Sequence, residues 1–343
     1  MKNYLLNFKT RLINLLPLLL SLLLGILLGW LAGSSWTNSN GEFQKVYEIR
    51  QGGYRLTNPL LDCEFASGMV EDNELRPFRH KVHELVDREI ESKRALHISV
   101  YFRDLNNGPW FGINEKEEFS PASLLKVPIM IAYLKLAESN PQMLTKRLKY
   151  EKASNYNAME NIRPSKSIEA GKSYTIDELI YRMIVYSDND AKDLLLRNMD
   201  MRDFEVPFRD LGIEIPGIRK SEDFMSVKTY ASFFRILYNA SYLNRKMSEK
   251  ALEYLAMVEF KEGLVAGVPS NIPVAHKFGE RRIINDDDHT DVKQLHDCAI
   301  IYYPDHPYLL CVMTRGYDFI ALGDDIRDIS NLVYREVDSQ YRK

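Results

Sequence analysis

The stretch FSPASLLKVPIMIAYLKLA, residues 119–137, begins as a turn and continues as an apolar helix. Ser123 and Lys126 stand three residues apart where the polarity changes. Positions i and i+3 share a helix face, and a serine hydroxyl needs a nearby base to become a nucleophile. Apolar neighbours would disfavour the charged ammonium and make the lysine such a base. Taken alone, however, a capping serine beside a lysine that extends to solvent is the favoured explanation.

Two further motifs follow in the chain. VYSDNDA places Ser187, Asp188 and Asn189 between two predicted helices, and VAHKFGE places Lys277 and Gly279 on a predicted strand. Each has a plain structural explanation, a helix cap for the first and an edge-strand charge for the second. The order Ser-x-x-Lys, Ser-Asp-Asn, Lys-x-Gly is much more specific than any one of them.

With these motifs in this order, the sequence resembles the class A β-lactamase and penicillin-binding serine hydrolase superfamily from about Arg76 to the C-terminus. The resemblance implies that Ser123 is acylated, that Lys126 accepts its proton and that Ser187 relays a proton to the leaving nitrogen. The resemblance also implies that Asn189 holds the substrate amide and that Lys277 attracts a substrate carboxylate. Gly279 is the glycine of the Lys-x-Gly motif and is implied in substrate binding. The backbone N–H groups of Ser123 and Glu280 would form the oxyanion hole. Asp188 is expected to bond within its own loop.

The sequence departs from the family pattern in two places. Phe278 stands where the family usually has Thr or Ser, so a hydroxyl that would contact a substrate carboxylate is missing. Three neighbours are candidates to compensate: His276, Arg281 and Arg282. The Glu-x-x-x-Asn loop that positions the hydrolytic water is also absent, because no asparagine lies between Asn198 and Asn239. The carboxylates after the second motif that are considered as a base in place of this loop are Glu205, Glu214, Glu222 and Asp223. Acylation is therefore better supported than rapid deacylation.

The rest of the chain predicts a membrane-tethered protein. Residues 12–33 carry no charge and are long enough for the roughly 30 Å of a bilayer core, which predicts a transmembrane helix. Lys2, Lys9 and Arg11 precede it, so residues 1–11 are expected in the cytoplasm and the remainder outside the cell membrane. A cleaved secretory signal is the alternative, and it also exports the domain. Residues 34–75 are interpreted as a linker with a partly ordered end.

Residues 76–343 predict one α+β domain with three layers. Two short β-rich segments around NNG form a hairpin near the start, and three more strands come from the end of the domain. Residues 121–260 are mostly helical, including a Thr175–Glu178 capping box. We therefore expect an antiparallel sheet of about five strands from both chain ends, flanked by terminal helices at about residues 76–93 and 322–337, with an all-helical subdomain inserted.

Composition excludes several other functions. A net charge of −3 makes nucleic acid an improbable partner. Cys63, Cys298 and Cys311 are too few and too scattered for a disulfide scaffold or a zinc site, and are interpreted as buried small hydrophobes. The acidic segment NDDDHTD, residues 285–291, is interpreted as a hairpin tip rather than a metal site. No metal or organic cofactor is expected.

The combined prediction is an extracytoplasmic serine hydrolase that forms an acyl-serine with a β-lactam or a related D-alanyl peptide of the cell wall. A D-alanyl-D-alanine carboxypeptidase or penicillin-binding protein with slow deacylation is one alternative. The other is a binding module without catalysis, which would recognise a wall peptide. Oligomeric state and natural substrate have no signal in the sequence.

Overall fold

The computed structural model describes residues 48–63, 75–106, 108–151, 156–218, 221–285 and 290–342. The predicted cytoplasmic segment 1–11 and transmembrane helix 12–33 lie outside these residues. Within the described ranges, no helix is both long and apolar enough to cross a bilayer.

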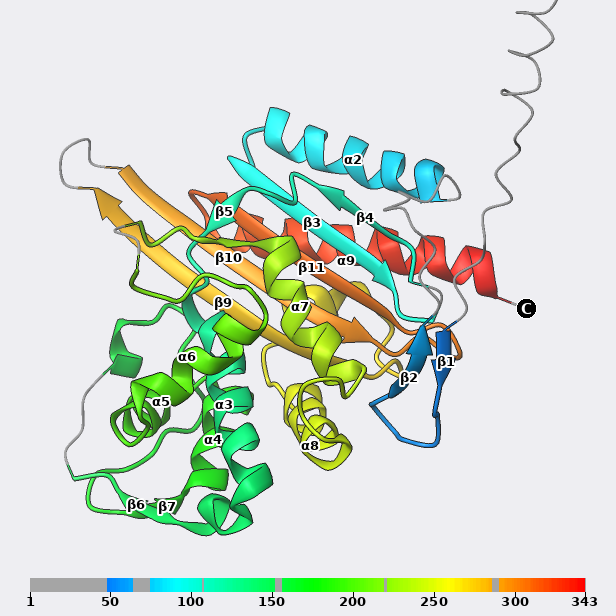
Figure 1. Ribbon diagram of the computed structural model, residues 1–343. Coiled ribbons are helices and arrows are strands. Elements are labelled where there is room, and N and C mark those ends of the chain that lie inside the picture. The colour runs from blue at the N-terminus through cyan, green and yellow to red at the C-terminus, as the bar shows by residue number, and fades with distance from the viewer. Residues whose placement is uncertain are drawn as a thin grey trace, which may run out of the picture. The chain divides into compact units, whose positions relative to one another are not determined.

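A five-stranded antiparallel sheet forms the centre of the domain (Figure 1). Its strand order is β4-β3-β11-β10-β9. The strands are β3 (His97–Asp104), β4 (Trp110–Ile113), β9 (Val274–Asn285), β10 (Thr290–Ile301) and β11 (Tyr308–Gly316). Two strands precede the helical insertion and three follow it, which confirms that the sheet is built from both ends of the domain. β9, which carries the Lys-x-Gly motif, is an edge strand.

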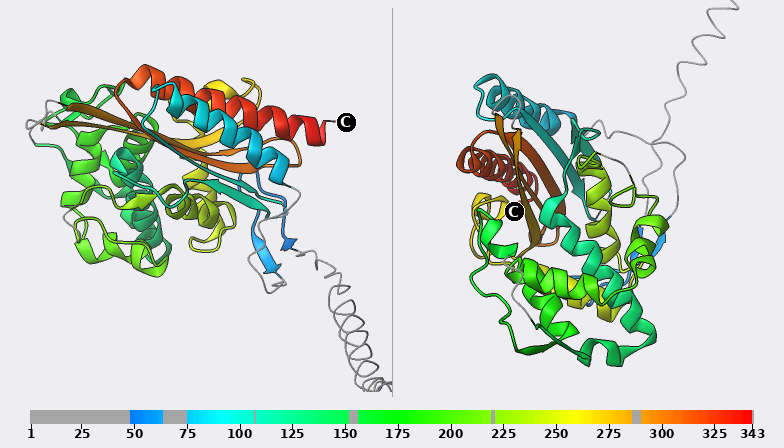
Figure 2. Two further views of the ribbon diagram at one scale, coloured as in Figure 1. Left: turned by 90° about the horizontal axis from the view of Figure 1, so that it is seen from above. Right: turned by 90° about the vertical axis from the view of Figure 1, so that its left-hand side faces the viewer.

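Helices α2 (Arg76–Glu91) and α9 (Phe319–Tyr341) lie side by side on one face of the sheet (Figure 2). The helix predicted over residues 322–337 is therefore longer at both ends. Phe78 of α2 packs edge-on against Phe102 and Phe111, with ring centroids 4.9 and 5.0 Å apart. This aromatic contact ties α2 to β3 and β4 and forms part of one apolar core.

The inserted helices cover the opposite face and form the second core (Figures 1 and 2). They are α3 (Lys126–Ser139), α4 (Ile176–Val185), α5 (Asn189–Arg197), α6 (Met201–Asp210), α7 (Val227–Tyr238) and α8 (Arg245–Ala256). The short 3₁₀ turns are η2 (Ala122–Leu125), η3 (Pro141–Thr145), η4 (Tyr156–Met159) and η5 (Leu264–Gly267). The remaining short strands of this part are β5 (Glu118–Phe119), β6 (Arg147–Lys149), β7 (Ser173–Thr175) and β8 (Met225–Ser226).

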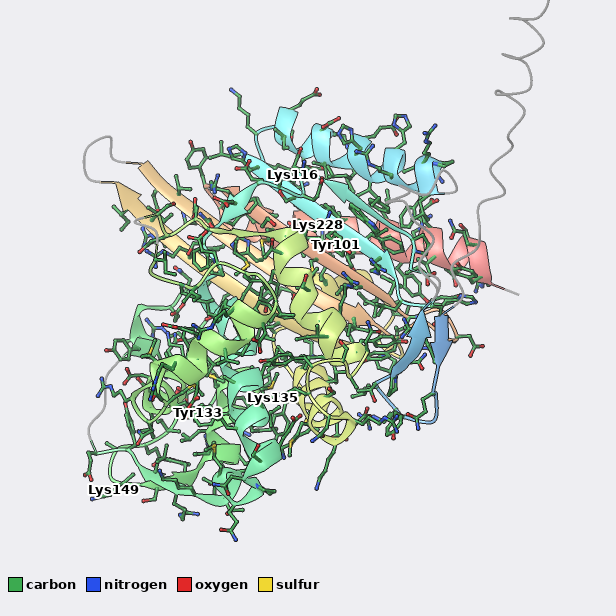
Figure 3. All side chains as sticks on the ribbon, viewed as in Figure 1. Tyr101, Lys116, Tyr133, Lys135, Lys149 and Lys228 are labelled. Atoms are coloured by element: carbon green, nitrogen blue, oxygen red, sulfur yellow. A yellow bond between two sulfur atoms is a disulfide. The ribbon has the colours of Figure 1, made fainter. Side chains whose placement is uncertain are left out.

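Helix α3 runs through the centre of the inserted part and fixes the position of its neighbours. Most of its side chains are buried, as its apolar sequence predicts. Tyr133, labelled in Figure 3, donates its hydroxyl to the carbonyl of Leu195 in α5 at 2.7 Å. At the start of α4, Thr175 and Glu178 form the predicted capping box. The three-layer fold and its helical subdomain are thus as the sequence indicates.

Part of the predicted linker is folded onto the domain. Strands β1 (Glu48–Arg50) and β2 (Leu60–Cys63) pair antiparallel. Between them, the backbone N–H groups of Leu56 and Thr57 each donate to the Glu249 carboxylate of α8 at 2.9 Å. Residues 48–63, within the predicted linker, therefore include a part that is bonded to the helical part of the domain.

The expectation for two of the cysteines was wrong. Cys298 and Cys311 are buried, but a disulfide joins them. They lie opposite each other on the neighbouring strands β10 and β11. Cross-strand register creates this proximity, and sequence spacing alone did not show it.

The contact of η5 with α9 gives a test of the fold. A Cβ atom on Gly267 would lie 2.6 Å from the carbonyl oxygen of Arg327 and 2.7 Å from the backbone nitrogen of Asn331. Gly267→Ala should therefore push η5 off α9 and lower the free energy of unfolding by about 2 kcal/mol, measured by denaturant unfolding.

Gly323→Ala on α9 is the matched control. A Cβ there would make only an ordinary contact, 3.7 Å from Leu295 Cδ2. Since alanine favours a helix over glycine, this variant should be as stable as the wild type or up to about 1 kcal/mol more stable. Equal stability of the two alanine variants would contradict the packing argument.

Candidate active site

Ser123 lies in the 3₁₀ turn η2, directly before α3. The sequence placed it at the N-terminus of the helix, and the structure places it one turn earlier. The preceding residue, Ala122, has a positive φ of 48°, which directs the chain into this turn. Leu125 is the N-cap of α3 and makes no side-chain capping bond, so the alternative of a capping serine is not observed.

Lys126 is fully buried, so the alternative of a lysine extending to solvent is wrong. Its Nζ lies 2.8 Å from Ser123 Oγ, 2.9 Å from Ser187 Oγ and 2.7 Å from the Ser187 carbonyl oxygen. Burial lowers the pKa of Lys126 well below the usual lysine value, and the neighbouring Lys277 lowers it further. A neutral amine fits these contacts, because it donates two bonds to Ser187 and keeps a lone pair toward Ser123.

The second motif joins α4 to α5. Ser187 has a positive φ of 58°, a conformation that costs a non-glycine residue about 1–3 kcal/mol and is typical of functional sites. Asp188 caps α5 by accepting from the backbone N–H groups of Asp190 and Ala191 at 3.0 and 3.3 Å. Asp188 also accepts from Ile168 N at 2.8 Å. These bonds agree with the structural role expected for Asp188.

Lys277 is buried although β9 is an edge strand, so it is not a solvated surface charge. Its Nζ donates to Ser187 Oγ at 3.1 Å and to the carbonyl of Phe278 at 2.9 Å. Burial lowers the pKa of Lys277 to about 7. The side chains of Ser123, Lys126, Ser187 and Lys277 therefore form one continuous hydrogen-bonded chain.

Gly279 brings β9 against η2. A Cβ at this position would lie 3.0 Å from Leu124 N and 3.0 Å from the Pro121 carbonyl oxygen. Both are backbone atoms, which cannot move aside without moving η2. The third motif thus needs glycine here for close approach of the strand to the turn that carries Ser123.

Asn189 and Glu280 contact a loop that the sequence did not single out. Asn189 Nδ2 donates to Glu160 Oε1 at 2.6 Å, and Glu280 Oε1 accepts from Ile162 N at 2.7 Å. Glu160 also raises the pKa values of Lys126 and Lys277 through its charge. It follows η4, in a segment without helical or strand periodicity and without a motif, so the sequence offered no signal for it. The expected substrate-binding residues Asn189 and Glu280 are thus linked to this loop.

The residues proposed to compensate for Phe278 have other partners. His276 is buried, with Nδ1 2.9 Å from Asp297 Oδ1. Arg281 pairs with Glu222, and Arg282 Nε lies 2.8 Å from Asp291 Oδ1. Each of the three is engaged with a carboxylate outside the serine–lysine chain.

Most of the carboxylates that follow the second motif are also engaged in ion pairs. Three of them are paired with arginines: Glu205 with Arg209, Glu222 with Arg281, and Asp223 with Arg315. The carboxylates that act electrostatically on Lys126 are instead Glu160 and Asp188. The loop that would hold a hydrolytic water is therefore not replaced by these three.

The acidic segment 285–291 joins β9 to β10, as a hairpin tip would, although residues 286–289 lie outside the described structure. Asp291 pairs with Arg282 and Lys293. Across the described ranges, no cluster of three or more His, Cys, Asp or Glu side chains could hold a metal ion.

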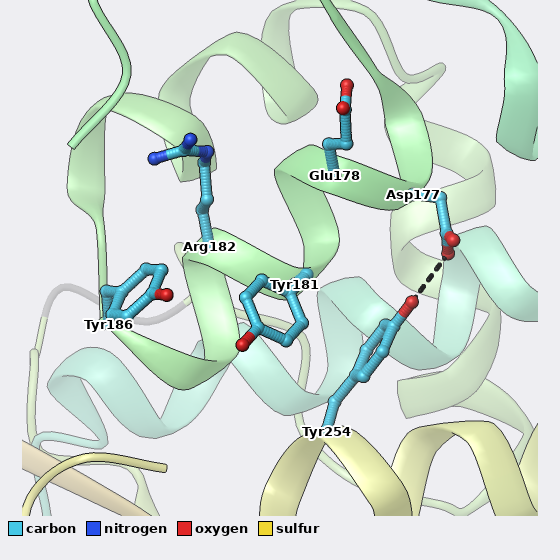
Figure 4. Close-up of a pocket in the computed structure, with 6 residues that line it drawn as sticks. All are labelled: Asp177, Glu178, Tyr181, Arg182, Tyr186 and Tyr254. Carbon is cyan, nitrogen blue, oxygen red and sulfur yellow. Dashed lines mark hydrogen bonds between the residues drawn. The ribbon is translucent and has the colours of Figure 1, made fainter. Parts of the chain in front are cut away.

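A pocket of about 280 Å³ lies away from these residues, between α4 and α8 (Figure 4). Six residues line it: Asp177, Glu178, Tyr181, Arg182, Tyr186 and Tyr254. The Tyr254 hydroxyl donates to Asp177 Oδ1 at 3.0 Å. None of the predicted site residues is in this pocket, so the chemistry argued above does not involve it.

Comparison with solved structures finds the same fold. The structure of PBP-A has a TM-score of 0.63 at 21% identity, covering 77% of this chain and 97% of that chain. A PBP-A mutant in an acyl-enzyme complex with penicillin G has a TM-score of 0.62 at 20% identity, covering 77% of this chain and 97% of that chain. A class A β-lactamase from Mycobacterium abscessus has a TM-score of 0.63 at 19% identity, covering 75% of this chain and 99% of that chain. A search of curated proteins found no match.

The sequence itself carries a family signature. A profile of the beta-lactamase enzyme family matches residues 78–337. This range includes the whole central sheet, the inserted helices, most of α9 and the three motifs that meet around Ser123. The chain therefore belongs to the beta-lactamase enzyme family and has a β-lactamase-like serine hydrolase fold.

Proposed function

We propose that the protein forms an acyl-enzyme at Ser123 with β-lactams or related D-alanyl peptides of the cell wall, and that it releases the acyl group slowly. The observation that carries the proposal is the hydrogen-bonded chain Ser123–Lys126–Ser187–Lys277. A binding module would not need this complete set of buried groups, since holding a ligand requires neither a base nor a proton relay.

Each side chain of this hydrogen-bonded series has a role that fits its environment. Ser123 Oγ attacks the carbonyl carbon, and its proton passes to the neutral amine of Lys126. Ser187 Oγ accepts hydrogen bonds from Lys126 and Lys277, so its own proton is free to be donated to the leaving nitrogen. Lys126 then restores the proton of Ser187. The scissile C–N bond breaks, and the acyl group stays on Ser123.

Slow deacylation is supported by the lack of a Glu-x-x-x-Asn loop in the sequence. Hydrolysis requires a base within hydrogen-bond reach of a water molecule. Three of the carboxylates after the second motif are paired with arginines, as described above. The proposal therefore favours an enzyme of the penicillin-binding type over a rapid β-lactamase.

The proposed location is outside the cell membrane, with the chain anchored by residues 12–33. The uncharged segment and the basic residues before it support this orientation. Cell-wall peptides and β-lactams are found on that side, which fits the proposed substrates.

The central prediction concerns Ser123. When full-length protein in detergent is mixed with excess penicillin, intact-mass spectrometry should show an adduct that persists for hours, while absorbance of the β-lactam band falls slowly. Ser123→Ala should abolish both signals, because the nucleophile is removed. Ser139→Ala, an exposed serine at the end of α3, is the control and should behave as the wild type.

The remaining outcomes separate the alternatives. Rapid loss of absorbance with little adduct, dependent on Ser123, would indicate a true β-lactamase with an unrecognised base. Neither adduct nor turnover with any acyl donor would favour the binding module.

A second prediction concerns the contact of β9 with η2. The proposed oxyanion hole uses the backbone N–H groups of Ser123 on η2 and Glu280 on β9, so their separation must stay fixed. Gly279→Ala would force the two elements apart by steric clash. Acylation should slow by about 100-fold, whereas Gly323→Ala should leave it unchanged. A Gly279→Ala enzyme with normal acylation would rule out this oxyanion hole.

A third prediction concerns pH. Acylation requires the neutral form of Lys126, so its rate should rise with pH and reach a plateau well below the usual pKa of a lysine. Lys277 contributes to the lowered pKa of Lys126 by charge repulsion. Lys277→Gln should therefore slow acylation and also move the midpoint of the pH–rate profile upward. A midpoint that stays constant or moves downward would show that Lys126 is not the base.

A further inference from the structure

Phe278 changes the strand face that the family uses for a substrate carboxylate. Its ring is buried and stacks on Phe260, with centroids 4.2 Å apart. The same ring lies over the ammonium of Lys277, with Nζ 4.1 Å from the centroid. An apolar wall therefore replaces the hydroxyl that a substrate carboxylate would contact.

Lys277 already uses two of its three donors within the protein. A lysine ammonium has three N–H bonds. Two are directed to Ser187 Oγ and the Phe278 carbonyl, and the Phe278 ring lies against the same nitrogen. Burial also lowers the pKa of Lys277 to about 7, so much of its population is uncharged near neutral pH.

Glu280 adds an acidic group two residues along the same strand. Its Oε1 accepts from Ile162 N, but its Oε2 is buried and receives no hydrogen bond from a donor group. Burial, together with the charge of the adjacent Glu160 carboxyl, raises the pKa of Glu280 to about 7. Two adjacent carboxyl groups resist simultaneous ionisation, because their negative charges repel each other.

Glu160 extends this acidic pair across the acyl site. Its Oε1 accepts from Asn189 Nδ2, the donor expected to hold the substrate amide. Glu160 and Glu280 thus connect the Ser-Asp-Asn motif to β9. The negative charge of Glu160 raises the pKa values of Lys126, Lys277 and Lys192 of α5, while burial lowers them. A carboxylate entering beside Ser187 and Lys277 would be repelled by this negative charge.

We infer that the enzyme acylates on substrates whose leaving group carries no carboxylate, such as an internal amide or ester, and that Phe278 and Glu280 are the residues that determine this specificity. The inference rests on the proposed acylation of Ser123. It narrows the substrate class from terminal D-alanyl peptides to internal linkages, in which the residue after the scissile bond continues as an amide.

Penicillin G and its methyl ester test this inference, because they differ only in the carboxylate. Full-length protein in detergent is mixed with each compound, and Ser123 adduct and β-lactam absorbance are followed together. Each rate constant is divided by that of hydroxide-catalysed hydrolysis of the same compound, which removes differences in ring reactivity. The methyl ester should acylate at least 10-fold faster.

Variants separate a change in specificity from a general loss of activity. A general loss lowers the acylation rates with penicillin G and with its methyl ester equally and leaves their ratio unchanged. Phe278→Thr combined with Glu280→Ala should bring the ester-to-acid ratio to one or below, since it restores a hydroxyl and removes the acid. Glu160→Gln keeps the acceptor for Asn189 but removes the charge, so it should lower the ratio in part. Glu91→Gln, an exposed glutamate on α2, is the control and should leave both rates unchanged.

The outcomes distinguish the two proposals. If both compounds label Ser123 but penicillin G reacts as fast as its ester or faster, the specificity inference is overturned and the proposed acyl-enzyme stands. A ratio that the double variant does not change would also overturn the assignment to Phe278 and Glu280. If neither compound gives adduct or turnover, the proposed function fails, and the specificity inference fails with it.

Discussion

The burial of Lys126 is the constraint on which the rest of the site depends. An isolated ammonium in an apolar interior is costly, and a protein lowers that cost by deprotonating the group or by surrounding it with acceptors. Here both occur, because the oxygens of Ser123 and Ser187 surround an amine whose pKa is lowered. The same burial that makes the lysine costly for the fold lowers its pKa, as its proposed role as a base requires. Stability and chemistry are therefore in direct competition at this position.

The architecture supplies this environment from three distant parts of the chain. The turn η2 carries the serine, the α4–α5 junction carries Ser187, and the edge strand β9 carries Lys277. Each element is fixed by its own packing, α3 through its buried length and β9 through β10. The positive φ angles of Ala122 and Ser187 show that the backbone is held in unfavourable conformations at two of the three junctions. A rigid surrounding core is what allows such strain to persist.

The sequence predicted the parts of this arrangement that depend on local pattern and motif order. The β-rich segments, the apolar helices and the capping box at Thr175 could be predicted because each has its own local sequence pattern. The site residues of the three motifs were legible because their order is specific. Glu160 was not, since it stands in an irregular loop and acquires its position only when that loop meets Asn189. The disulfide was missed for a related reason, as strand register brings Cys298 and Cys311 together.

Phe278 and the neighbouring acids have one physical explanation if they are considered together. A free carboxylate on the substrate needs a donor and a positive charge, and the aromatic ring at Phe278 removes the first while shielding the second. Placing acids at Glu160 and Glu280 near the same surface would be unfavourable for an enzyme that binds carboxylates, because like charges in a poorly solvated site repel strongly. It is favourable for one that must reject them. The groups proposed for acylation are complete beside this altered surface, which fits the proposed change of substrate with unchanged acyl-transfer chemistry.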